Sequence, residues 1–283
     1  MTTTPEPPPS DVSEMTSAPP GGSGVRVVDG DHLLSLRAIT KDFGPVQALK
    51  HVDLDIPAGQ VTALIGDNGA GKSVLIKTIS GIYPPSSGQI FWKGREVHAH
   101  APRDSSELGI ATVYQDLALC DNLDIVQNMY LGREETKFGQ LDEIKMELAT
   151  KDLLKDLAVS TVKSVRQLVS SLSGGQRQAI AVARAVMRDS ELVIMDEPTA
   201  ALGVSQTAQV LQLVRRLADR GIAVILISHN LNDVFSVADR IAVMHLGTLV
   251  SHGPISNYDT ASAVEMITTG ASSRVPSTPP VVD

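Results

Sequence analysis

The sequence predicts an α/β fold built on a parallel β-sheet. Three short apolar runs, at 61–65, 192–195 and 223–227, are rich in β-branched residues and are typical of strands buried on both faces. Between the last two runs, apolar residues recur at helical spacing over 205–219. A strand, a helix and a second strand in succession indicate a βαβ unit, whose strands run parallel.

The first of these strands leads through a glycine-rich turn into 71–80, which is expected to form a helix. From about 116 to 187 the chain is more polar, and Leu and Met recur at i, i+3 and i+4 over 141–157. This interval is expected to be a helical insertion in the sheet domain. The folded body should span 33–270, as one large domain or two small ones.

The two ends of the chain have a different composition from the body. Residues 1–32 are rich in Pro, Ser, Thr and Gly, and 271–283 are similar. Such segments bury too little apolar surface to offset the entropy lost on ordering, so both are expected to be disordered tails.

Composition argues against several classes of protein. No Lys/Arg block stands out and aromatic residues make up only 3%, which argues against a nucleic-acid partner. No apolar run approaches the ~18 residues that span a bilayer, and the N-terminal segment lacks the apolar stretch of a signal peptide. The single cysteine excludes an internal disulfide and is typical of a reducing compartment. A cytosolic location is expected, with any membrane role depending on a partner.

A phosphate-binding loop follows the first predicted strand. Its glycines let the backbone curl so that successive N–H groups point at one anion, and the helix that follows adds its positive N-terminal dipole. Lys72 is expected to reach the β- and γ-phosphates of ATP, and Ser73 to hold Mg²⁺. The residues that fit the G-x-x-x-x-G-K-[ST] pattern are Gly66, Asp67, Asn68, Gly69, Ala70, Gly71, Lys72 and Ser73.

Two carboxylates end the second strand. Asp196 and Glu197 directly follow the apolar run 192–195, and parallel sheets place ligands at the carboxyl ends of their strands. Asp196 can bind Mg²⁺ through water, and Glu197 can orient or deprotonate an attacking water. His229 follows the next predicted strand, so it should face the same crevice and contact the γ-phosphate or that water.

A second anion site is predicted at the segment Leu172-Ser173-Gly174-Gly175-Gln176, here called the LSGGQ segment. It precedes a helix with Ala and Val on one face, predicted over 179–186. A serine and free backbone N–H groups at a helix start suit a phosphate. One nucleotide is not expected to contact both sites within one chain, so a head-to-tail pair of chains would hold it between them.

Together these motifs resemble the ATP-binding subunit of ABC transporters, in the family's order and spacing over 34–268. The resemblance implies a P-loop NTPase with a RecA-like core and mainly parallel sheet, an N-terminal antiparallel β portion and a helical insertion subdomain. It implies that Phe43 stacks on adenine and that Gln115 senses both Mg²⁺ and the transmembrane partner. It also implies that Ser173, Gly175 and Gln176 bind the ATP held by a second copy.

A finer resemblance is to importers of monosaccharides of the ribose, xylose and fructose type. It is carried by 66–72, 114–119, 131–134 and 198–203. This implies an ATPase with a single ATP-binding domain at the cytoplasmic face of the membrane, bound to permease subunits and served indirectly by an extracytoplasmic solute-binding protein. An importer of another solute, a soluble ABC ATPase without a permease, and a non-catalytic nucleotide sensor are the alternatives.

Two positions depart from the family's pattern. Val74 replaces a second hydroxyl residue that contacts the α-phosphate, so weaker nucleotide affinity is expected, by about 1 kcal/mol for one neutral hydrogen bond. Gly203 replaces an aspartate that helps to couple the two nucleotide sites of the pair, which puts cooperativity between those sites in doubt.

Overall fold

The computed structural model describes residues 32–159, 161–187 and 189–273. Its centre is a six-stranded sheet of order β12-β11-β3-β10-β9-β6, in which β12 alone is antiparallel to its neighbour. The predicted parallel sheet is therefore confirmed. The strands are β3 (Val61–Gly66), β6 (Ile110–Val113), β9 (Leu192–Asp196), β10 (Ala223–Ile227), β11 (Arg240–His245) and β12 (Thr248–Pro254).

Both faces of this sheet are buried, which explains why its strands are continuous apolar runs. Along β10, alternate side chains enter two different hydrophobic clusters: Val224 and Leu226 pack on one side, and Ile225 and Ile227 on the other. The helices around the sheet are α1 (Lys72–Ile79), α6 (Val204–Asp219), α7 (Leu231–Val237) and α8 (Thr260–Thr269). Helix α6 lies where the spacing of apolar residues predicts it.

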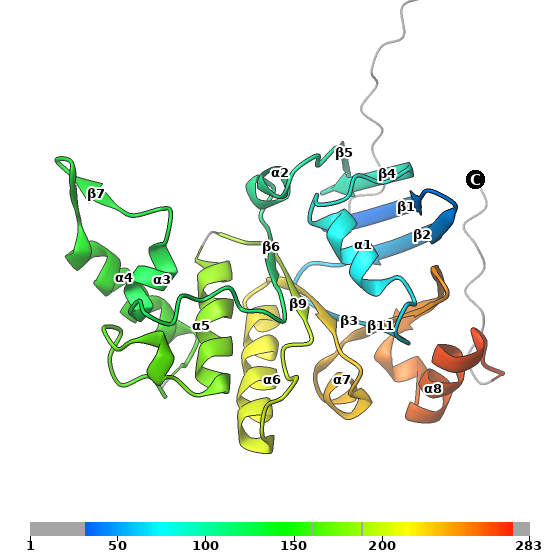
Figure 1. The fold of residues 1–283 in the computed structure, drawn as a ribbon. Coiled ribbons are helices and arrows are strands. Elements are labelled where there is room, and N and C mark those ends of the chain that lie inside the picture. The colour runs from blue at the N-terminus through cyan, green and yellow to red at the C-terminus, as the bar shows by residue number, and fades with distance from the viewer. Residues whose placement is uncertain (1–31, 160, 188, 274–283) are drawn as a thin grey trace, which may run out of the picture.

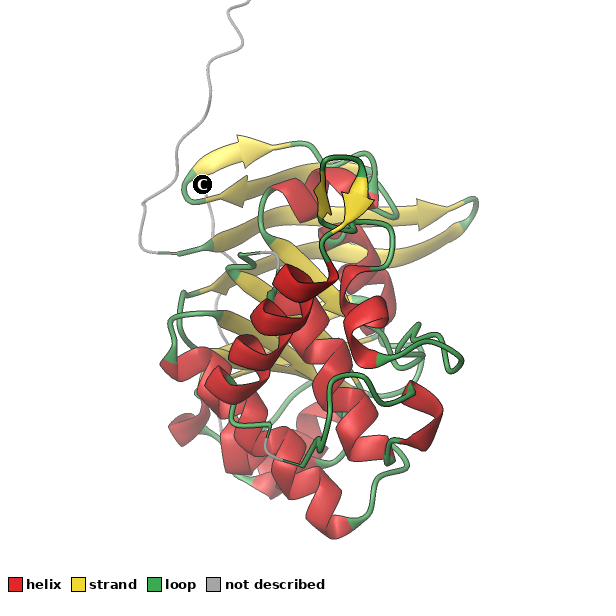
Figure 2. Cartoon of the chain, turned by 90° about the vertical axis from the view of Figure 1, so that its left-hand side faces the viewer, coloured by secondary structure: helices red, strands yellow, loops and turns green. Residues whose placement is uncertain are grey.

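A four-stranded antiparallel sheet, of order β2-β1-β4-β5, lies beyond α1 (Figures 1 and 2). Its strands are β1 (Leu34–Phe43), β2 (Val46–Ile56), β4 (Ser87–Trp92) and β5 (Arg95–Val97), and α2 (Pro102–Glu107) follows them. The antiparallel N-terminal portion implied by the family resemblance is therefore present.

The interval predicted as a helical insertion lies to one side of the sheets in Figure 1. It contains α3 (Ile125–Tyr130), α4 (Glu143–Asp156), the 3₁₀ turn Val169–Ser171, α5 (Gly174–Val186) and a small hairpin of β7 (Thr136–Lys137) and β8 (Gln140–Leu141) that no sequence pattern predicts. Helix α5 begins five residues before the predicted start at 179. The reason is that Ser173 caps its N-terminus, which makes the two glycines of the LSGGQ segment the first residues of the helix.

Within the described residues, no helix combines the length and apolarity needed to cross a bilayer. The predicted tails fall almost wholly outside the described residues, apart from His32 and 271–273.

Candidate functional site

A cavity of about 600 Å³ lies at the carboxyl ends of β3, β9 and β10. It brings together most of the residues expected to handle the nucleotide, from segments far apart in the sequence. Those lining it are Asn68, Gly69, Gly71, Lys72, Ser73, Val74, Gln115, Asp196 and Glu197. Val74 also packs against the hydrophobic core beneath the sheet, so its side chain faces both the cavity and the interior.

Two glycines make the phosphate loop possible. Gly66 has φ of 154°, and a Cβ there would lie 2.4 Å from the carbonyl oxygen of Met244. Gly71 has φ of 100° and immediately precedes α1, whose N-terminus has no side-chain cap. The first turn of α1 therefore presents backbone donors to the cavity without a side chain over them, which is the arrangement an anion requires.

Lys72 lies folded across the loop. Its Nζ donates to the carbonyl oxygens of Gly66, at 2.7 Å, and Asp67, at 2.9 Å. Burial lowers the pKa of the Lys72 ammonium, and the nearby carboxylates of Glu197, Asp67 and Asp196 oppose that shift. A phosphate group in the loop would stabilise the charged ammonium, which burial deprives of water.

The carboxylates form the opposite wall of the cavity. Strand β9 pairs with β10 so that Asp196 lies beside Ile227, which places the end of β10 next to both carboxylates, as predicted. Burial, followed by the charge of Glu197, raises the pKa of Asp196, while Lys72 and Lys77 oppose this. Mutual repulsion and partial burial thus make Asp196 ready to accept a cation.

Glu197 is held in position from two directions. His229 Nδ1 lies 2.8 Å from Glu197 Oε2, and the Glu197 N–H donates to the Ile227 carbonyl at 3.0 Å. The backbone of Glu197 has φ of 50°, a conformation that costs a non-glycine residue free energy and that recurs at functional sites. His229 thus contacts the candidate base itself, although it is not among the residues lining the cavity.

The LSGGQ segment lies apart from this cavity: none of its residues is among those lining it. The Ser173 hydroxyl accepts from the Gln176 N–H at 3.4 Å, and Gln176 Oε1 accepts from the Ser173 N–H at 2.9 Å, a reciprocal capping box. Gln176 Nε2 also donates to the Thr161 carbonyl at 2.6 Å. Both ends of the Gln176 amide are therefore engaged within the chain.

Phe43 ends β1 and is 41% exposed, so it is not part of the hydrophobic core. Its ring meets that of Tyr83 edge-on at 5.2 Å between centroids, and Lys41 Nζ lies 5.3 Å from the same ring. Phe43 is not among the residues lining the cavity.

Some residues of the cavity wall lie outside every sequence motif. Val46, Gln47 and Lys50 come from β2, and Leu246 and Gly247 from the turn between β11 and β12. The turn is tied to the phosphate loop and to β2, since the Gly247 N–H donates to Ala70 and the Gly247 carbonyl accepts from Lys50. Only long-range strand pairing brings these residues together, so no local pattern identifies them.

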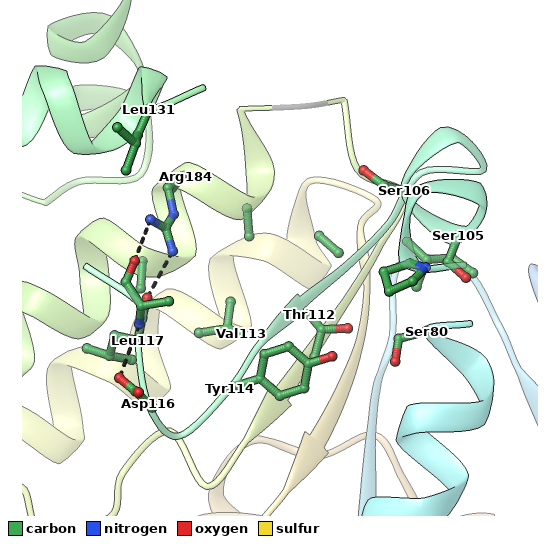
Figure 3. Close-up of a pocket in the computed structure, with 16 residues that line it drawn as sticks. Ser80, Ser105, Ser106, Thr112, Val113, Tyr114, Asp116, Leu117, Leu131 and Arg184 are labelled. Atoms are coloured by element: carbon green, nitrogen blue, oxygen red, sulfur yellow. Dashed lines mark hydrogen bonds between the residues drawn. The ribbon is translucent and has the colours of Figure 1, made fainter. Parts of the chain in front are cut away.

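A second cavity, of about 260 Å³, lies between α2 and β6 on one side and α5 on the other (Figure 3). Tyr114 and Asp116, the neighbours of Gln115, line it, as do Leu131 and Arg184. Arg184 donates to the carbonyls of Leu117 and Ala118, both at 2.9 Å, and burial lowers the pKa of its guanidinium. Tyr114 and Asp116 therefore line this cavity, whereas Gln115 between them lines the cavity of Lys72.

Comparison with protein families gives a match to the ABC transporter model over residues 49–200. The fructose import ATP-binding protein FrcA of Rhizobium meliloti is 44% identical, over 83% of this chain and 94% of the relative. The xylose/arabinose import ATP-binding protein XylG of Sulfolobus acidocaldarius is 43% identical, over 86% and 96%. The ribose import ATP-binding protein RbsA of Caldanaerobacter subterraneus is 37% identical, and this chain spans about half (47%) of its length.

Solved structures give the same picture of the fold. A nucleotide-free ATP-binding cassette from an ABC transporter has a TM-score of 0.71 and 26% identity, over 79% of this chain and 91% of the other. A second cassette, in its ADP conformation, also has a TM-score of 0.71 and 26% identity, over 84% and 95%.

Proposed function

The chain belongs to the ABC transporter family, and from this premise we propose that it is the ATP-binding and ATP-hydrolysing subunit of a monosaccharide importer. The observation that carries the proposal is the meeting of Lys72, Asp196 and Glu197 in one cavity. Relatives named for the import of fructose and of xylose or arabinose, which this chain matches over nearly their whole length, support the substrate class.

ATP would bind with its phosphates over the first turn of α1. There the uncapped N-terminus and Lys72 supply the positive potential that the β- and γ-phosphates require. The exposed Phe43 ring would stack on the adenine. That ring is 41% exposed, lies in T-shaped contact with Tyr83 and has Lys41 Nζ 5.3 Å from its centroid.

The residues around Lys72 fit a bound Mg²⁺. Among the described residues no group of three or more His, Cys, Asp or Glu could hold a metal without help, so the ion would share its ligands with the nucleotide. Ser73, Gln115 and Asp196 line the cavity with the oxygen atoms that Mg²⁺ prefers. When bound, Mg²⁺ neutralises charge on the transferred phosphate.

Hydrolysis needs a base opposite Lys72. A water oxygen attacks the γ-phosphorus while the bond from that phosphorus to the bridging oxygen of ADP breaks, and Glu197 accepts the water's proton. The contact at 2.8 Å with His229 orients the carboxylate for this step. Inorganic phosphate and ADP leave, and Glu197 returns its proton to solvent.

The site requires a second copy of the chain. The LSGGQ segment ends in a helix start suited to a phosphate, yet it does not reach the Lys72 cavity of its own chain. In a head-to-tail pair, Ser173 and Gly175 of one copy would meet the ATP bound by the other, with Gln176 holding that helix start in position. Two copies would then enclose two ATP molecules.

The cavity in Figure 3 is the surface we assign to the permease. It lies between the sheet domain and the helical insertion, and its lining includes the residues on either side of Gln115. A cytoplasmic helix of the permease seated there would therefore sense the nucleotide through 114–116. The subunit would act at the cytoplasmic face of the membrane, as a peripheral protein, with an extracytoplasmic solute-binding protein delivering the sugar.

The test is a Glu197→Gln variant of the subunit, reconstituted with its permease. We expect ATP hydrolysis to fall at least ~100-fold, the size typical of removing a catalytic base, while ATP binding is retained. Uptake of labelled fructose, xylose and ribose by cells expressing the wild type identifies the sugar. Wild-type turnover in the variant would refute the role of Glu197, and uptake of a solute that is not a sugar, with none of the three sugars taken up, would refute monosaccharide import.

A further inference from the structure

An arginine of helix α6, Arg216, hydrogen-bonds to the end of α4. Arg216 Nη1 donates to the carbonyl oxygens of Leu157, at 2.9 Å, and Ala158, at 3.3 Å. Both acceptors lie just past the last residue of α4, where unpaired carbonyls carry the negative end of the helix dipole. A guanidinium is well suited to this place because its planar set of donors can serve two carbonyls together.

From there the contacts continue to the LSGGQ segment. A few residues after Ala158, the Thr161 carbonyl accepts from Gln176 Nε2 at 2.6 Å, and the other end of that amide accepts from the Ser173 N–H. The first turn of α5 also touches α6 directly, since a Cβ on Gly175 would lie 3.0 Å from Cβ of Gln206. The start of α5 is thus connected to α6 at two points: through Gln176 and the segment after α4, and through the packing of Gly175 against Gln206.

Packing alone does not define this arrangement. A cavity of about 200 Å³ lies between α5 and α6, and it is lined by Ala158, Thr161, Gly175 and Arg216 among others. Next to such a space the chain has room to shift, so the hydrogen bonds of Arg216 and Gln176 set the position of the helix start.

We propose that Arg216 is a positioning residue that fixes the LSGGQ segment relative to α6, and through α6 relative to the loop that follows Glu197. Helix α6 begins at Val204, directly after that loop. The consequence for catalysis rests on the proposed function, in which the LSGGQ segment completes the ATP site of a second copy. Arg216 touches no substrate, so its effect is transmitted by Gln176.

The experiment compares Arg216→Ala, Arg216→Lys and, as a matched control, Arg220→Ala. Arg220 lies one turn further along the same helix and is 4.0 Å from the carboxylate of Asp156, a distance that gives a weak ion pair. Amide hydrogen exchange is measured for the peptide containing 173–178 in the full chain. We expect exchange about tenfold faster in Arg216→Ala, an intermediate rate in Arg216→Lys and wild-type exchange in Arg220→Ala.

A second measurement addresses the catalytic consequence. ATP-driven dimerisation is followed by analytical ultracentrifugation in the Glu197→Gln background, and binding of a fluorescent ADP analogue is titrated in parallel. Arg216→Ala should weaken dimerisation about tenfold and leave ADP binding within twofold of the wild type. Unchanged exchange in Arg216→Ala would overturn the positioning role. If the Glu197→Gln chain with Arg216 intact fails to dimerise with ATP, the proposed function fails, while the exchange result still decides whether Arg216 positions the segment.

Discussion

Two helix starts carry the expected phosphate chemistry, and they are built in opposite ways. Helix α1 begins at an uncapped glycine with a left-handed backbone, so its first donors face the cavity. Helix α5 begins at Ser173, whose side chain and backbone are both engaged in a capping box with Gln176. The first is open to an anion, whereas at the second the N–H groups of Ser173 and Gln176 are already hydrogen-bonded within the chain.

The surroundings of the two helix starts differ in the same sense. Around α1, burial lowers the pKa of Lys72 and raises that of Asp196, and Glu197 has φ of 50°. Around α5, the Gln176 amide bonds at both ends. The α1 side therefore gives up stability for binding, whereas the α5 start is stabilised by contacts within its own chain. This difference predicts substitutions with opposite effects.

The largest effect is expected at Lys72. In Lys72→Ala the phosphates lose a charge-assisted contact in a partly buried place, so ATP affinity should fall about 100-fold. Isothermal titration with Mg-ATP measures this in the isolated chain. Lys77→Ala is the control, because Lys77 is on the same helix but its Nζ lies 5.6 Å from the Tyr83 ring centroid, outside the lining of the cavity. Equal affinity in Lys72→Ala and Lys77→Ala would contradict the assignment.

At Ser173 the expected effect is smaller and is confined to the pair of chains. Ser173→Ala removes an N-cap, which should lower the free energy of unfolding by about 1 kcal/mol, and should weaken ATP-driven dimerisation about tenfold while ATP binding to one chain is unchanged. Ser173→Asp separates the two roles. Aspartate caps a helix as well as serine does, but its charge repels phosphate, so stability should return and dimerisation should not. Recovery of dimerisation in Ser173→Asp would show that the hydroxyl acts only as a cap.

How far the sequence predicts this site depends on how local each signal is. The phosphate loop and the pair Asp196-Glu197 are readable because strand, loop and helix follow one another within a dozen residues. The sequence predicts the α5 start five residues late, because two glycines disfavour a helix unless a cap precedes them. The cavity walls formed by Val46 and Leu246 depend on contacts between strands far apart in the sequence, which no local spacing encodes. The hairpin of β7 and β8 is local, but each of its strands has only two residues, too few to give an alternating pattern.

A substitution at Val74 tests how close the α-phosphate lies to the start of α1. Val74→Thr is close to isosteric and adds one hydroxyl at the edge of the cavity that Val74 lines. If that hydroxyl reaches the α-phosphate, affinity for ATP and ADP should increase about fivefold, the equivalent of one neutral hydrogen bond. Val74→Ala is the control for altered packing against the core and should not tighten binding. An unchanged dissociation constant in Val74→Thr would show that the α-phosphate lies out of reach.

The smallest expected effect is on the stability of the ligand-free chain, which Asp196 should lower and Ser173 should raise. Its pKa is raised above 3.8 in the folded chain, so the folded state holds this proton to higher pH than the unfolded state does. The stability that the group contributes is complete below pH 3.8 and is lost as the pH rises through the raised pKa. At pH 7 the ionised carboxylate is therefore a net cost to the ligand-free protein.

Asp196→Asn removes that cost and should raise the melting temperature of the ligand-free chain by about 2 °C, measured by differential scanning calorimetry at pH 7. The gain should shrink as the pH falls through the raised pKa, and added Mg-ATP should reverse the order, since only the wild type keeps the carboxylate that binds the cation. Asp219→Asn, at an exposed carboxylate paired with Arg215, is the control and should change little. A lower melting temperature in Asp196→Asn, like that expected for Ser173→Ala, would contradict this: Asp196 would then stabilise the ligand-free chain, as the Ser173 cap does.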